Sequence, residues 1–104
     1  MTRPPAHLSK PAKALYASIT SAYVLESHHL AVLVKGLEAS DRADAARAVI
    51  ERDGLLVETR FGEVKASAAV AIERDSRTAF FAAIKQLGLD IDGPPSPSTR
   101  NRRS

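Results

Sequence analysis

The sequence predicts a mainly α-helical protein that forms a single domain. Apolar residues recur every three or four positions along three separate stretches, as they do on one face of an amphipathic helix. The apolar content comes mainly from Ala, Leu and Val, with 5% aromatic residues and no Trp, and alanine favours helices. The chain has 104 residues, which is enough for one domain with a modest core.

The first helix is expected from about residue 10 to residue 25. Ser9 is a suitable N-cap, and Pro11 falls in the first turn, where its missing N–H is tolerated. Helical spacing relates the apolar side chains of Ala12, Leu15, Tyr16, Ile19 and Tyr23. Residues 1–8 contain two prolines, and we expect them to form a flexible basic arm ahead of this helix.

The second helix is expected over residues 27–53, with Ser27 as its cap and Gly54 after its end. It would span roughly 40 Å. If the helix kinks, the kink is expected near Gly36 or at Ser40-Asp41. Its expected apolar stripe contains Leu30, Leu33, Val34, Leu37, Ala45, Ala48 and Val49. A long amphipathic helix in a small chain favours association of helices within or between chains. We therefore expect a hairpin of the first two helices, and we assign a subunit interface to Leu30, Leu33, Val34 and Leu37.

The stretch LLVETRFGEVKA, residues 55–66, interrupts the helical pattern. Before Gly62, Leu56, Glu58 and Arg60 alternate with Val57, Thr59 and Phe61, and Val64 resumes an extended segment. This pattern predicts a short β-hairpin. An exposed, charged connection between helices is the alternative interpretation, and the residues leave both open.

A third helix is expected from Ala68 to Leu87, followed by Gly88 as a stop. Its expected apolar positions are Ala69, Ile72, Phe80, Phe81, Ile84 and Leu87. After Asp92 the sequence is rich in Pro, Ser and Arg. We therefore expect one helical domain over residues 9–92 and a disordered basic tail over residues 93–104.

The positive charge gathers at the two ends of the chain. The net charge is +3, yet residues 26–53 contain more acids than bases. The N-terminal part bears Arg3, Lys10 and Lys13 without an acid, and the last residues bear Arg100, Arg102 and Arg103. Basic ends are typical of contacts with nucleic acid or acidic proteins, and these six residues are our candidates for DNA phosphate contact. Improved solubility is the equally simple explanation.

The residues do not predict catalysis, a metal site or a cofactor. The chain has no Cys, which excludes thiolate ligands and a cysteine nucleophile. His28 and His29 are adjacent, so they point in different directions from a helix, and zinc needs three or four convergent ligands. No phosphate-binding glycine motif is present.

The N-terminus lacks the apolar core of a secretory signal, and no apolar run reaches membrane-spanning length. We therefore expect a soluble protein that is not an enzyme.

The order of several short motifs resembles the small subunit of tailed-phage terminases. A tyrosine-containing helix, ALYASITSAYVL, is followed by a charged helix ending in IERDGL. A connector of the form R-x-G-x-x-K comes next, with Arg60, Gly62 and Lys65. A helix with ERDSR then ends in Phe80 or Phe81 and the LGL of residues 87–89. Relatives often have a proline after the connector lysine; this chain lacks it, so Ser67 is expected to cap the third helix instead.

The resemblance implies a function in viral genome packaging in the host cytoplasm. Such subunits assemble as homo-oligomeric rings, engage double-stranded viral DNA and regulate the terminase large subunit, which carries the ATPase and nuclease. In a ring, Arg60 is expected to pair with Glu63 of a neighbour. The basic tail would contact either DNA or the large subunit. Two other classes remain open: a small dimeric helical DNA-binding regulator, and a helical oligomeric interaction protein that does not bind DNA.

Overall fold

A computed structural model describes residues 3–89 of the chain. The helices α1 (Lys10–Ala22) and α2 (Ser27–Asp53) are followed by the strands β1 (Leu56–Glu58) and β2 (Val64–Ala66) and by the helix α3 (Ala68–Gln86). The mainly α-helical class is therefore confirmed. The connector forms the predicted antiparallel β-hairpin, and because all of its strand residues are exposed it is also an exposed connection between helices.

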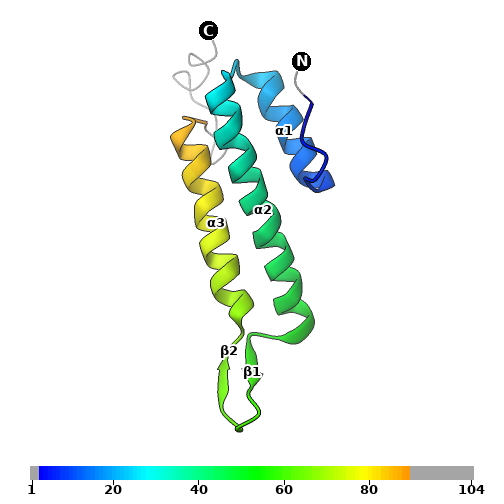
Figure 1. The fold of residues 1–104 in the computed structure, drawn as a ribbon, viewed down its shortest axis with the longest axis vertical. Coiled ribbons are helices and arrows are strands. Elements are labelled where there is room, and N and C mark those ends of the chain that lie inside the picture. The colour runs from blue at the N-terminus through cyan, green and yellow to red at the C-terminus, as the bar shows by residue number, and fades with distance from the viewer. Residues whose placement is uncertain (1–2, 90–104) are drawn as a thin grey trace.

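The helices run up, down and up along an elongated molecule (Figure 1). Its principal extents are 59 × 30 × 20 Å. The helices α2 and α3 lie antiparallel over most of their lengths, whereas α1 extends beside only the N-terminal half of α2 (Figure 1). The β-hairpin projects from the opposite end of the α2–α3 pair. The expected packing of α1 on α2 is present, but α3 is the helix that packs along most of α2.

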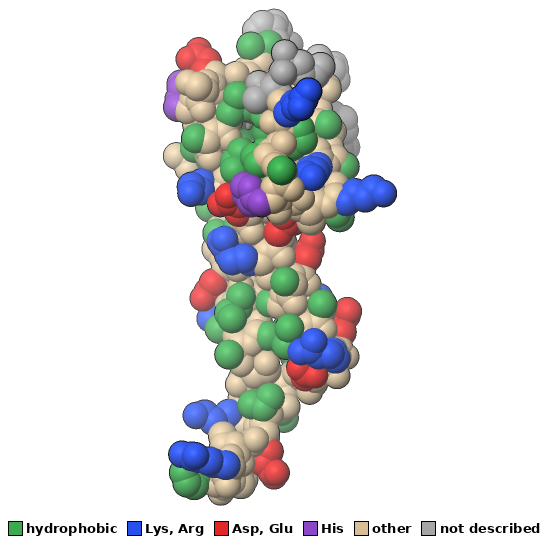
Figure 2. All heavy atoms as spheres, turned by 45° about the vertical axis from the view of Figure 1, so that its right-hand side comes forward, with side chains coloured by type: hydrophobic (Ala, Val, Ile, Leu, Met, Phe, Trp, Pro, Cys, Tyr) green, Lys and Arg blue, Asp and Glu red, His purple; other side chains and the backbone are tan. Residues whose placement is uncertain are grey.

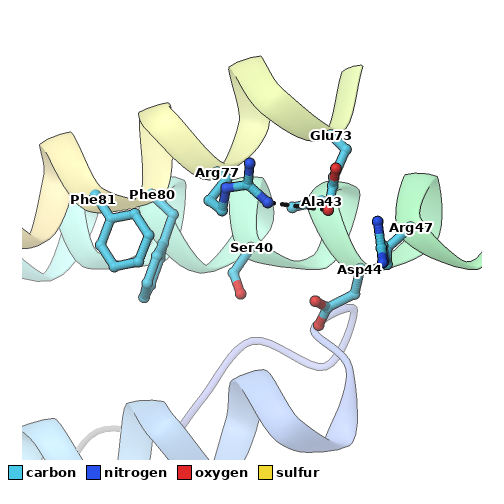
Figure 3. Close-up of a pocket in the computed structure, with 8 residues that line it drawn as sticks. All are labelled: Ser40, Ala43, Asp44, Arg47, Glu73, Arg77, Phe80 and Phe81. Atoms are coloured by element: carbon cyan, nitrogen blue, oxygen red, sulfur yellow. Dashed lines mark hydrogen bonds and ion pairs between the residues drawn. The ribbon is translucent and has the colours of Figure 1, made fainter. Parts of the chain in front are cut away.

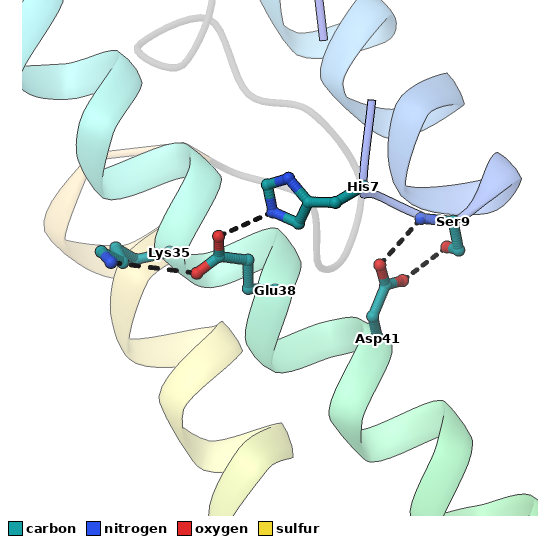
Figure 4. Close-up of polar contacts among 5 residues, drawn as sticks. All are labelled: His7, Ser9, Lys35, Glu38 and Asp41. Carbon is teal, nitrogen blue, oxygen red and sulfur yellow. Dashed lines mark hydrogen bonds and ion pairs between the residues drawn. The ribbon is translucent and has the colours of Figure 1, made fainter. Parts of the chain in front are cut away.

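A cluster of polar contacts fixes the start of α1 to the middle of α2 (Figure 4). Ser9 is the N-cap of α1, and its hydroxyl accepts from the N–H of Ala12 at 3.2 Å. The backbone N–H of Ser9 donates to Asp41 at 2.9 Å, and its hydroxyl donates to the other oxygen of the same carboxylate. His7 lies 2.8 Å from Glu38. These contacts hold the chain ahead of α1 against α2 before the helix begins.

The main hydrophobic core lies where the three helices meet. Its buried side chains are Leu8, Ala12, Tyr16, Ile19, Leu33, Leu37, Ile84 and Leu89. Because Leu8 is buried in this core, the packed part of the chain begins within the segment that we expected to be a flexible arm. A second, smaller cluster of Ala46, Ile50 and Ala69 joins α2 and α3 nearer the hairpin. Small side chains there let the two helices approach closely without α1.

At Gly36, α2 comes close to α3. A Cβ atom built on this buried glycine would lie 2.7 Å from the Cβ of Ala83. The glycine is therefore required by packing, because α2 continues through it as one helix. The expected kink at Gly36 or Ser40-Asp41 does not appear as a break in α2.

We predict that Gly36→Val lowers the free energy of unfolding by about 1–3 kcal/mol, because the added methyl groups overpack the contact with Ala83. Thermal unfolding followed by circular dichroism measures this loss. The control is Ala48→Val, since Ala48 is exposed on the same helix and tests only the lower helix propensity of valine. Equal stability of the two variants would contradict the close approach.

Two helix ends differ from the sequence prediction. The first helix ends at Ala22, because Tyr23 adopts an extended conformation with φ −130° and ψ 145°. The N-cap of α2 is Glu26, and Ser27 is its first helical residue. The N–H of Glu26 donates to Nδ1 of His29 at 3.4 Å. Ser67 caps the start of α3 as expected. Gly54 and Gly88, which follow the ends of α2 and α3, have positive φ angles.

Two residues of the expected apolar stripe on α2 do not lie on its buried face. Ala45 and Ala48 are exposed, and the buried face of α2 instead contains Ala39, Ala43 and Ala46. Alanines occur on every side of this helix, so hydropathy alone does not select the buried ones. On α3, two of the apolar positions at helical spacing, Ile72 and Phe81, are 49% and 43% exposed.

The assignment of Leu33 and Leu37 to a subunit interface is wrong for this fold. Both side chains are 0% exposed, in the core that α2 shares with α1 and α3. Leu30 and Val34 are partly buried against the same core. The stripe was identified correctly as a packing surface, but the helices that cover it belong to the same chain.

Candidate functional site

The β-hairpin is the most exposed structured part of the molecule. Leu56 pairs with Ala66, Val57 with Lys65 and Glu58 with Val64. A hydrogen bond of 2.8 Å from the N–H of Ser67 to the carbonyl of Leu55 closes its base. Every residue of both strands is exposed, so neither face of this small sheet packs on the helices.

The turn of the hairpin is organised by Thr59 and Gly62. The N–H of Thr59 donates to the carbonyl of Glu63 at 2.7 Å, and the N–H of Gly62 donates to the carbonyl of Thr59 at 2.9 Å. The Thr59 hydroxyl accepts from the N–H groups of Phe61 and Glu63, both at 3.3 Å. Gly62 has φ 84°, a conformation that favours glycine. The turn therefore holds Arg60 and Phe61 at the tip.

Apolar side chains cover much of this exposed hairpin. Phe61 is 78% exposed, and Leu56 and Val64 are each 62% exposed. Because alternate residues of a strand face the same side, the register places Leu56, Val64 and Ala66 on one face. Hydrophobic and basic side chains lie together at this end of the molecule (Figure 2).

No helix covers the apolar side chains of the hairpin, and the hairpin is too small to bury them itself. A lone two-stranded hairpin is marginally stable in water, and exposed strand edges leave backbone groups free to pair. Covering a fully exposed Leu, Val or Phe side chain contributes about 1.5–3 kcal/mol. A cluster of such side chains on a projecting element is typical of a contact surface for another molecule.

The N-terminal DNA-contact candidates lie apart from the hairpin. Arg3 and Lys10 are exposed and Lys13 is half-buried, at or before the first turns of α1. Among residues 3–89, none of these three forms an ion pair. Arg60 and Glu63 are both exposed at the hairpin tip. Arg100, Arg102 and Arg103 lie outside the described residues.

Charged and histidine side chains elsewhere form local contacts. The rings of His28 and His29 lie 4.1 Å apart. At the end of α2, Arg52 donates to Asp53 at 2.9 and 2.8 Å. This hydrogen bonding lowers the pKa of Asp53 and raises that of Arg52, as in a surface ion pair. Within the part of the chain that the structure describes, no three potential metal ligands gather, and no helix has the length and apolarity to span a membrane.

The prediction of a hairpin from the sequence did not include the exposure of its apolar side chains. The signal was present, since Leu55, Leu56, Val57, Phe61 and Val64 outnumber the charged residues of the same stretch.

Comparison of the chain with family models, with curated proteins and with solved structures finds no match. The residues and the fold are therefore the basis for its proposed function.

Proposed function

We propose that the chain is the small subunit of a tailed-phage terminase. In this proposal it assembles as a homo-oligomeric ring, engages double-stranded viral DNA in the host cytoplasm and regulates the large ATPase-nuclease subunit. The motif order that suggests this family falls on consecutive elements. IERDGL ends α2, the R-x-G-x-x-K connector forms the hairpin, and LGL follows α3.

The observation that carries the proposal is the unpartnered apolar hairpin at the end of a helical pair. A chain of 11.2 kDa has a limited core, and exposing Leu56, Phe61 and Val64 is unfavourable unless another molecule covers them. A second copy of the chain supplies that cover in a self-assembling subunit. The exposed apolar hairpin supports oligomerisation directly, and it supports DNA binding only in combination with the basic residues.

DNA engagement is assigned to the basic start of α1. Lys10 and Lys13 lie on α1, which contains no acid, and the side chains of Arg3, Lys10 and Lys13 have no carboxylate partner among residues 3–89. Lys and Arg side chains of this kind contact phosphates, release counterions and produce salt-dependent binding without reading base sequence. The tail residues Arg100, Arg102 and Arg103 are proposed to add to this contact or to dock on the large subunit.

We predict that the double variant Lys10→Glu, Lys13→Glu binds double-stranded DNA more weakly for all sequences. Each lost phosphate contact reduces the salt dependence of log K by about 1. Fluorescence anisotropy with labelled DNA at several salt concentrations measures both effects. The matched control, Lys35→Glu with Arg42→Glu, makes the same charge change on α2. Equal losses in both variants would mean that net charge alone governs binding.

The same experiment separates the two other functional classes. A helical oligomer that does not bind DNA would show assembly but no salt-dependent DNA binding in the unmodified chain. A dimeric regulator would bind DNA as a dimer and would need a basic recognition helix in the major groove. The helix α2 carries Glu38, Asp41, Asp44, Glu51 and Asp53, which disfavours that class.

A further inference from the structure

An open groove lies between α2 and α3, near the start of α1 (Figure 3). Its volume is about 460 Å³. The rings of Phe80 and Phe81 lie at one end and charged side chains lie at the other (Figure 3). Phe81 is 43% exposed, so an apolar surface remains open beside the polar one.

The groove contains one carboxylate without a partner. Arg77 donates to Glu73 at 3.1 Å, and Arg47 lies 3.5 Å from Glu51. Asp44 is exposed, and it forms neither a hydrogen bond nor an ion pair with any residue between 3 and 89. An incoming cation would therefore meet a free negative charge next to an aromatic surface.

The hairpin tip has the complementary chemistry. The guanidinium of Arg60 lies 5.1 Å from the centre of the Phe61 ring, which is within the range of a cation–π contact. In the described part of the chain, Arg60 has no carboxylate partner. The turn thus presents an exposed aromatic ring and an uncompensated positive charge side by side.

A hairpin cannot reach the groove of its own chain in this fold. From Phe81 to the start of α3 at Ala68 is about 20 Å of helix, and the hairpin extends in the direction away from the helices (Figure 1). From Ser40 to the end of α2 is about the same distance. The tip and the groove can meet only between two copies.

We propose that the hairpin tip of one copy docks in the α2–α3 groove of a second copy. Phe61 packs against Phe80 and Phe81, and Arg60 pairs with Asp44. The contact is heterologous, with one tip and one groove on each copy, so it repeats from copy to copy and closes into a ring when the rotation permits. This inference rests on the proposed self-assembly and specifies its contact.

The contact sets how neighbouring copies are placed. The tip lies at one end of a molecule 59 Å long, whereas the groove lies along the middle of the helices (Figure 3). Neighbouring copies are therefore offset or tilted along their long axes. This arrangement differs from pairing of Arg60 with a neighbour's Glu63, which requires tip to meet tip.

The test is a charge exchange in the full chain, with association measured by sedimentation over a range of concentrations. Arg60→Glu and Asp44→Arg are each expected to weaken association by about tenfold, because each places like charges together. The double variant restores the opposite charges and is expected to recover association to within about threefold of the original chain. Circular dichroism checks that each variant keeps the helical fold.

Two control pairs make the result specific. Lys65→Glu with Asp44→Arg makes the same exchange from another hairpin position and is expected not to recover association. Arg60→Glu with Glu63→Arg tests tip-to-tip pairing, and recovery in this pair but not with Asp44→Arg would overturn the inference. Unchanged assembly in both single variants would also overturn it, while leaving the proposed function intact. A chain that stays monomeric at every concentration would contradict both.

Discussion

Leu37→Ala is expected to lower the free energy of unfolding by about 2–5 kcal/mol. The Leu37 side chain is 0% exposed and lies in the core that all three helices share. Truncation removes its transfer free energy and leaves a cavity that close-packed neighbours fill only in part. A domain of this size has a total stability of about 5–15 kcal/mol, so the variant loses a large share of it. Urea unfolding measures the change.

This prediction also tests whether Leu37 is a core residue or a subunit contact. The matched control is Leu37→Met, which conserves volume and is expected to cost less than about 1.5 kcal/mol. If Leu37 instead faced another subunit, Leu37→Ala would weaken assembly and leave the unfolding of the dissociated chain unchanged. That outcome would contradict the three-helix core.

Replacement of residues 56–65 by Gly-Ser-Gly is expected to abolish assembly while the helices remain folded. Every strand residue of the hairpin is exposed, and none belongs to either buried cluster. The helical core is therefore retained, and Ser67 still caps α3 through its contact with the N–H of Ala69 at 3.2 Å. Light scattering on a sizing column should give the mass of one shortened chain, somewhat below the 11.2 kDa of the unmodified chain.

A gentler variant keeps this test informative if the shortened chain folds poorly. Leu56→Thr with Phe61→Ser and Val64→Thr removes the apolar surface but leaves the turn residues Thr59 and Gly62 in place. It is expected to dissociate to a monomer as well. Glu58→Gln alone is the control and should assemble normally. Assembly that survives in both hairpin variants would show that another surface joins the copies.

Local features of the fold were predictable because neighbouring residues determine them. Ser9 and Ser67 cap helices, and Gly54, Gly62 and Gly88 adopt positive φ, as their positions beside apolar-periodic segments suggested. The hairpin followed from a glycine between two short alternating stretches. These features need no knowledge of distant contacts.

The long-range packing was not predictable in the same way. The stripe on α2 has partners in both α1 and α3, and hydropathy does not say whether an apolar stripe is covered by its own chain or by another. The polar contacts of Ser9 with Asp41 and of His7 with Glu38 join residues about thirty positions apart. In an alanine-rich helix, small side chains on several faces satisfy the same spacing, so Ala45 was chosen where Ala46 is buried.

The candidate site was partly predictable for a related reason. Arg60 and Glu63 were placed correctly at an exposed connector, since charged residues around a glycine favour a turn on the surface. The exposure of Leu56, Phe61 and Val64 became evident only once the fold showed that no helix packs on the hairpin. Likewise, the groove with Asp44 and Phe81 exists because α1 covers only part of the α2–α3 pair (Figure 1).

The mass of the unmodified chain in solution tests the central claim most directly. Light scattering on a sizing column, at several protein concentrations and without DNA, gives that mass. Self-assembly through the hairpin predicts a single species of many times 11.2 kDa. A species of one or two chains at all concentrations would contradict ring assembly by the subunit itself.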